Sequence, residues 1–139
     1  MVELTVDRVA YDTGQQRAII LLRHEESERY LPILVGPLEA AAIAMAIEGF
    51  EPPRPQTHDL LKLILDKLET TVTGILIDDV RDETFFAQIS MSMGDSVVEV
   101  DSRPSDAIAL ALRCKAPIRA LERVLDVAGV TADQDQVHS

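Results

Sequence analysis

The stretch DSRPSDAIALALR, residues 101–113, places three charged side chains, a proline and two serines in front of an almost wholly apolar run. Proline fixes φ near the helical value, lacks an N–H group and disfavours helical geometry in the residue before it. The stretch therefore predicts a strand that ends near Arg103 and a helix that begins at Pro104. Asp106 lies in the first turn, where a carboxylate at the positive end of the helix dipole contributes about 0.3–1 kcal/mol.

The polar cluster at this corner has a structural and a functional interpretation. Helix capping accounts for the proline, for Asp106 and for one serine, since Ser102 or Ser105 can cap. It accounts less well for Asp101 and Arg103, because the corner between a strand and a helix is a common place for sites. An ion pair between Arg103 and Asp106 is a further structural interpretation.

The rest of the chain shows the patterns of a mixed structure. Strands are expected where apolar and polar residues alternate or short apolar runs occur, at 2–9, 17–24, 29–35, 70–80, 83–91 and 96–101. Helices are expected at 36–49, at 57–68, from Pro104 onward and near 120–128.

The second helix, 57–68, has Thr57 as its expected N-cap. Its spacing predicts a polar face that includes Lys62 and a core stripe. The residues of this expected stripe are Leu60, Leu61, Ile64, Leu65 and Leu68.

The two halves of the chain resemble each other. Glu3, Thr5, Val6 and Asp12 match identical residues 66 positions later, whereas Pro37, Glu39 and Ala40 match Pro104, Asp106 and Ala107 67 positions later. This predicts an α+β fold of internally duplicated βββα units, with a mixed or antiparallel sheet packed with apolar helices. We expect one domain over 1–128, with pseudo-repeats at about 1–68 and 69–128, followed by a flexible tail over 129–139.

Composition narrows the class of protein. The chain has 139 residues, of which 47% are hydrophobic but only 4% aromatic, so the core is expected to be aliphatic. The net charge of −11 opposes non-specific binding to nucleic acid. The lone Cys114 excludes an internal disulfide and argues against a cysteine zinc site. The first ten residues lack a signal-peptide pattern, and no apolar segment reaches membrane-spanning length, so a cytoplasmic protein without membrane contact is expected.

Two helical segments are apolar on all sides, at 40–47 and 107–112. Such helices need cover on more than one face. We therefore expect a homo-oligomer with a large apolar interface. The alternative is a monomer in which the two helices cover each other.

Three segments together, VGPLEAAAIAMAI (35–47), RPQTHDLL (54–61) and DSRPSDAIALALR (101–113), resemble the bifunctional nuclease (BFN) domain family. The likeness covers about residues 1–128. Members are described as acting on DNA and RNA, and many are bacterial. The resemblance implies a small α+β domain and a nuclease of low sequence specificity, without settled catalytic residues. The motif residues are Arg54, Pro55, Thr57, His58, Asp59, Arg103, Pro104, Ser105 and Asp106.

Side chains suited to phosphodiester hydrolysis occur in these motifs. Histidine transfers protons, arginine stabilises charge on phosphate, and carboxylates hold Mg²⁺ or Mn²⁺. The expected catalytic residues are His58, Asp59, Arg103 and Asp106. The expected substrate-binding residues are Arg54 and Ser105, and the expected metal ligands are Asp59, Asp101, Asp106 and Glu39. No organic cofactor is expected.

Each candidate also has a plain structural interpretation, as a cap, a dipole partner or a surface ion pair. A non-catalytic binding or regulatory module that homo-oligomerises is therefore the alternative function. The basic residues Arg113, Lys115, Arg119 and Arg123 fit a solvated helix face better than a nucleic-acid contact.

Overall fold

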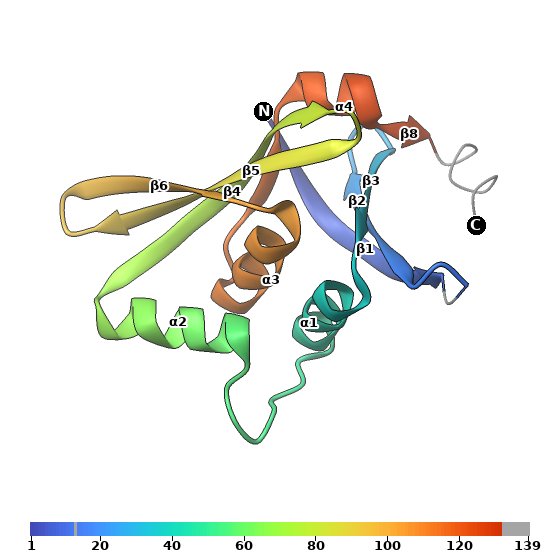
Figure 1. Ribbon diagram of the computed structural model, residues 1–139. Coiled ribbons are helices and arrows are strands. Elements are labelled where there is room, and N and C mark those ends of the chain that lie inside the picture. Colours follow the sequence, from blue (N-terminus) through green and yellow to red (C-terminus); the bar gives the residue numbers. More distant parts are fainter. Residues whose placement is uncertain (13, 132–139) are drawn as a thin grey trace.

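A computed structural model of the chain describes residues 1–12 and 14–131, and it confirms the α+β class (Figure 1). The strands are β1 (Val2–Asp12), β2 (Arg17–His24), β3 (Arg29–Val35), β4 (Thr70–Arg81), β5 (Thr84–Met93), β6 (Ser96–Ser102), β7 (Ile118–Ala120) and β8 (Val130–Thr131). The helices are α1 (Pro37–Glu48), α2 (Thr57–Lys67), α3 (Pro104–Cys114) and α4 (Glu122–Ala128). Both prolines expected to open helices, Pro37 and Pro104, do so.

The described strands form one mixed sheet in the order β6-β5-β4-β7-β1-β2-β3-β8. Neighbouring strands are antiparallel except β4 and β7, which run parallel. The short β7 therefore joins the two halves of the chain. The element order βββα occurs twice, but internal duplication of the sequence stays a prediction.

Helix α3 is the centre of the core. Its residues Ala107–Ala111 are buried, and it packs against β4 and β5 as well as against α1 and α2. Alanine side chains permit this close approach of several elements. One chain is thus enough to cover the apolar helix α3, as in the monomeric alternative stated above.

The capping residues of α2 and α3 differ from those expected from the sequence. Gln56, not Thr57, is the N-cap of α2, and its N–H donates to Asp59 Oδ2 at 2.9 Å, which is half of a capping box. Neither Ser102 nor Ser105 caps α3, because the backbone of Arg103 occupies the cap position and the Ser102 hydroxyl donates to the Arg103 carbonyl.

The expected core stripe of α2 is wrong. Leu60, Leu61, Ile64 and Leu68 are exposed, and Leu65 is only partly buried. The apolar spacing correctly indicates a helix with one apolar face, but nothing in residues 1–12 and 14–131 covers most of that face.

The expected tail begins with a strand, since Val130 and Thr131 pair with Tyr30 and Arg29 of β3. Residues 132–139, which include His138, lie outside the described residues. Among the helices of residues 1–12 and 14–131, none has the length and apolar character needed to cross a bilayer.

Candidate functional site

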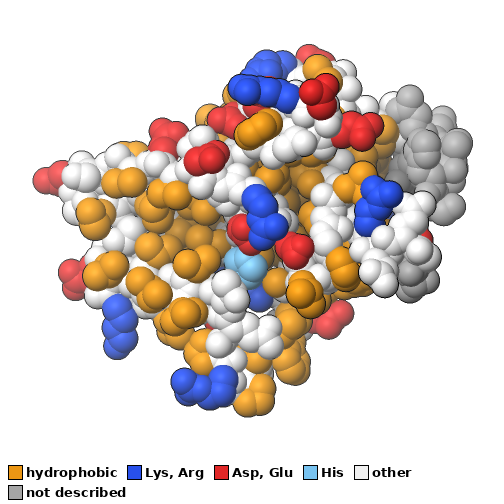
Figure 2. Space-filling model, in the orientation of Figure 1, with side chains coloured by type: hydrophobic (Ala, Val, Ile, Leu, Met, Phe, Trp, Pro, Cys, Tyr) orange, Lys and Arg blue, Asp and Glu red, His pale blue; other side chains and the backbone are white. Residues whose placement is uncertain are grey.

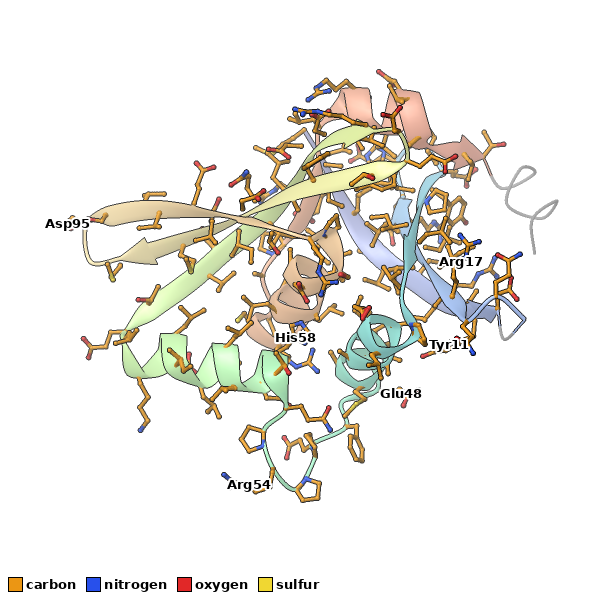
Figure 3. All side chains as sticks on the ribbon, in the orientation of Figure 1. Tyr11, Arg17, Glu48, Arg54, His58 and Asp95 are labelled. Carbon is orange, nitrogen blue, oxygen red and sulfur yellow. The ribbon has the colours of Figure 1, made fainter. Side chains whose placement is uncertain are left out.

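The first turns of α2 and α3 meet through a histidine and an aspartate. His58 is the second residue of α2 and points toward α3 (Figure 3), where Asp106 is the third residue. His58 Nε2 lies 2.9 Å from Asp106 Oδ1, although 48 positions separate the two residues in the sequence. The side chains are 10% and 34% exposed, so the pair lies at the edge of the core with one side open to solvent.

Arg103 completes this cluster from the last position before α3. Its Nε donates to Asp106 Oδ2 at 2.9 Å and its Nη2 to Asp106 Oδ1 at 3.2 Å. This two-pronged geometry is the strong form of an arginine–carboxylate pair. The Arg103 side chain is 65% exposed, so its outer face is accessible. We refer to His58, Arg103 and Asp106 as the His–Asp–Arg cluster.

Opposing effects act on the ionisation of Asp106. Burial raises its pKa, but hydrogen bonds from Arg103 and His58 outweigh burial, so the pKa lies below the ordinary value. The pKa of Arg103 is raised by its hydrogen bond to Asp106, and the charge of Glu39 acts in the same direction. Asp106 is therefore an ionised acceptor at neutral pH, and the hydrogen of the His58 contact lies on Nε2.

Asp59 faces a different partner. Its Oδ1 accepts from Arg113 Nε at 2.8 Å, and its other oxygen accepts the Gln56 N–H. The Gln56 hydrogen bond and Arg113 lower the pKa of Asp59 although burial opposes them. Arg113 also donates to the carbonyls of Ala42 in α1 and Ala109 in α3. Arg113 therefore connects three helices behind the cluster.

Two cavities on the α1 side adjoin the His–Asp–Arg cluster. One, of about 340 Å³, lies between α1, α2 and α3, and Glu39, His58, Arg103, Asp106 and Arg113 contribute its polar groups. The next, of about 480 Å³, also contains Glu39 and Arg103. Figure 2 shows a histidine in a hollow of this face with acidic and basic side chains beside it. A small anionic or polar group can thus reach both the imidazole and the guanidinium.

Comparison with known proteins places this sequence in a family. The sequence profile of the bifunctional nuclease domain matches residues 20–133, which include the whole cluster. The chain belongs to the bifunctional nuclease domain family. The resemblance seen in the motifs is thereby confirmed.

Relatives of this family member occur in bacteria and plants. An uncharacterised protein of Mycobacterium tuberculosis is 40% identical over 130 residues, which cover 94% of this chain and 77% of the relative. Bifunctional nuclease 2 of Oryza sativa subsp. japonica is 32% identical, and bifunctional nuclease 1 of Arabidopsis thaliana 31% identical, each over 78% of this chain. The chain spans 34% of the length of either plant protein.

The carboxylates of this bifunctional nuclease domain do not form a ready metal site. Within residues 1–12 and 14–131, no group of three or more His, Cys, Asp or Glu side chains is placed to hold one metal ion. Both oxygens of Asp106 already accept from Arg103, and Oδ1 also contacts His58. Both carboxylate oxygens of Asp106 are therefore occupied and are not free to bind a metal ion in this arrangement.

The other expected site residues are spread around the cluster. Glu39 and Asp106 share the 340 Å³ cavity, and buried Ser105 lines the 480 Å³ cavity. Asp101 lines a third cavity, on the opposite side of the His58–Asp106 pair. Arg54 is exposed in the loop between α1 and α2, away from His58 (Figure 3), and it lines none of these three cavities.

Arg113 is not among the residues expected from the sequence to form the site. Its side chain is only 9% exposed, so the expectation of a solvated basic face is wrong at this position. A signal was present, because Arg113 follows Asp106 by seven residues, which places both on the same face of α3.

The lowered pKa of Asp106 gives a prediction about stability. A carboxyl group whose pKa is lower in the folded chain adds stability above its unfolded value, about 3.9, and this stability is lost as the pH falls through the folded pKa. We expect Asp106→Asn to be less stable than the wild type at pH 7 and to lose less stability between neutral pH and pH 2. Urea unfolding across that range measures this, and parallel curves for both proteins would contradict it.

Proposed function

We propose that the chain hydrolyses phosphodiester bonds in DNA and RNA with low sequence specificity at the His–Asp–Arg cluster. The observation that supports this most is the 2.9 Å contact between His58 and Asp106 beside a cavity that also holds Arg103. Relatives in rice and Arabidopsis are named bifunctional nucleases, which supports the same substrate class.

His58 has the arrangement of a general base in this proposal. Its Nε2–H is donated to Asp106, so the neutral imidazole keeps a lone pair on Nδ1. That nitrogen takes a proton from water as the water oxygen bonds to phosphorus and one phosphorus–oxygen ester bond breaks. The proton then returns to the leaving oxygen. Asp106 orients the ring and stabilises the imidazolium, as carboxylates do in other catalytic pairs.

Arg103 has the arrangement of a phosphate-binding group. Arg103 donates to Asp106 through Nε and Nη2. Its Nη1 has no hydrogen-bond partner among the described residues, and its side chain is exposed, so a phosphate oxygen can bind there. Charge developing on that oxygen in the transition state is stabilised electrostatically. The negative charge of Glu39, which lines the same cavity, disfavours binding of an anion there.

The divalent-cation requirement expected from Glu39, Asp59, Asp101 and Asp106 stays a prediction. Mg²⁺ is commonly held by one or two protein carboxylates together with substrate phosphates. When bound in that way, the ion neutralises phosphate charge and lowers the pKa of water. The assay below tests this requirement independently of the cluster.

The experiment is cleavage of labelled single-stranded DNA and RNA by the purified full chain, with Mg²⁺, with Mn²⁺ and with EDTA. We expect cleavage of both polymers at many positions. Cleavage that persists in EDTA would overturn the cation requirement alone. The absence of cleavage in every condition would overturn the nuclease proposal.

A self-associating, non-catalytic binding or regulatory module is the second candidate function. The uncovered apolar face of α2 and the net charge of −11 favour it. An intact chain that self-associates but cleaves neither polymer is the result expected for this candidate.

A further inference from the structure

Helix α2 has an apolar face that the described part of the chain leaves open to solvent. Leu60, Leu61, Leu63, Ile64 and Leu68 are 41–62% exposed. Leucine-rich faces of amphipathic helices are normally buried. The open face extends over more than two turns of the helix, so it is not a single exposed side chain of the kind common on protein surfaces.

The β5–β6 hairpin continues this apolar surface. Met93, Val98 and Val100 are 37–50% exposed. The register pairs Met91 with Val98 and Ile89 with Val100, so all four side chains lie on one face of the hairpin. Strand β6 is also an edge of the described sheet, and its outer backbone groups have no neighbouring strand there.

A groove of about 650 Å³ separates α2 from the hairpin. Leu61, Ile64 and Leu65 form one wall, and Met91 and Val100 contribute to the other. Figure 2 shows apolar side chains on both walls of the groove, on this side of the molecule. The His58–Asp106 pair closes the groove at one end and borders the 340 Å³ cavity on its other side. An occupant of the groove therefore leaves that cavity free.

Two side chains of opposite charge lie at the outer ends of the two walls. Lys67 is the last residue of α2, and Asp95 lies at the tip of the hairpin (Figure 3). Residues 84–102 contain three acids, Asp95, Glu99 and Asp101, and no lysine or arginine. Glu99 lies between Val98 and Val100 in β6, so its side chain is on the face of the hairpin opposite to the apolar surface. Lys67 lies on the exposed apolar side of α2, three and four positions after Ile64 and Leu63. Within the part of the chain that the structure describes, Lys67, Asp95 and Glu99 take part in no ion pair. A second copy of the chain carries both elements, so it can place its Asp95 near Lys67 of the first copy and its Lys67 near Asp95 of the first copy.

We propose that α2 and the β5–β6 hairpin form a two-fold dimer interface, in which α2 of each copy packs on the hairpin of the other. Eight half-exposed apolar side chains present on the order of 400 Å² of apolar surface. That area lies within the range of about 300–600 Å² for the largest apolar patch of a monomer, a kind of patch that is often functional. It is about half of the roughly 800 Å² that each partner buries in a standard interface. The interface rests on the shape and charge of these elements and is independent of the nuclease chemistry.

The first test is sedimentation-velocity ultracentrifugation of the full chain over a concentration series. We expect a monomer–dimer equilibrium, and we expect Ile64→Glu to weaken the dimer at least about 30-fold, as loss of a central contact does. Val127→Glu is the matched control, because Val127 is 73% exposed on α4, and we expect no change. Far-ultraviolet circular dichroism confirms that both variants fold. A wild type that stays monomeric throughout, or a dimer that Ile64→Glu leaves intact, would overturn the interface.

An exchange of charges tests whether α2 of one copy packs on the hairpin of the other. Lys67→Glu alone and Asp95→Lys alone are each expected to weaken the dimer, because like charges then face each other. Mixing the two variants is expected to restore a heterodimer, since both contacts regain opposite charges. Failure of the mixture to associate more tightly than either variant would overturn the arrangement of α2 on the partner's hairpin.

Discussion

Replacing His58 by alanine is expected to slow phosphodiester cleavage about 10²- to 10⁴-fold, the usual contribution of a positioned general base. The reason is geometric: the imidazole borders the 340 Å³ cavity, and Asp106 orients it through Nε2. Asp106→Asn is expected to cause a loss of similar size, because an amide no longer holds the ring with Nδ1 free. Initial rates on single-stranded DNA and on RNA measure both effects.

Two variants outside the cluster serve as controls for this prediction. His24→Ala removes a histidine that contacts Ser27 and Glu26 on β2 and the following turn, and Asp126→Asn removes an exposed partner of Arg29. Neither residue lines the cavities around the cluster, so wild-type rates are expected for both. Undiminished cleavage by His58→Ala and Asp106→Asn would show that the activity arises elsewhere.

Replacing Arg113 by alanine is expected to lower the free energy of unfolding by about 3 kcal/mol, near the lower end for breaking a buried ion pair. The guanidinium is 9% exposed and donates to Asp59, to the Ala42 carbonyl and to the Ala109 carbonyl. Its loss leaves a carboxylate and two carbonyl groups short of a donor where α1, α2 and α3 meet. Urea unfolding at pH 7 measures the change.

Arg119→Ala is the matched control for the stability measurement. Among the residues that the structure describes, the ion-pair partner of Arg119 is Glu3, at a long distance of 3.8 Å on the surface. Such surface pairs contribute about 0–1 kcal/mol. Equal losses for the two variants would contradict the connecting role of Arg113. Arg113→Lys is expected to recover only part of the stability, because an ammonium group does not match the spread of the three acceptors.

Local signals in the sequence predicted most of the fold. The bounds of β2 and β3 agree with the expected segments 17–24 and 29–35, and Pro37 and Pro104 begin helices as expected. These features depend on alternation and on the backbone chemistry of proline, which act within a few residues. The prediction that the apolar stripe of α2 lies in the core is wrong. Periodicity shows that one face of a helix is apolar, but it does not show what covers that face.

The site was harder to predict because its contacts are long-range. His58 and Asp106 were both candidates from their positions in helix first turns, yet only the fold shows that they meet at 2.9 Å. Asp59 has the same type of position but contacts Arg113 instead. The choice between these partners depends on how α2 and α3 are packed, and no local pattern contains that information.

The measurement that tests the central claim most directly is a double-mutant cycle on cleavage rates with His58→Ala, Asp106→Asn and the variant that carries both. If the two residues act as one unit, the double variant is expected to be about as slow as the slower single variant. Losses that multiply, so that the double variant is slower by the product of the two single effects, would show that His58 and Asp106 act independently and would contradict the account.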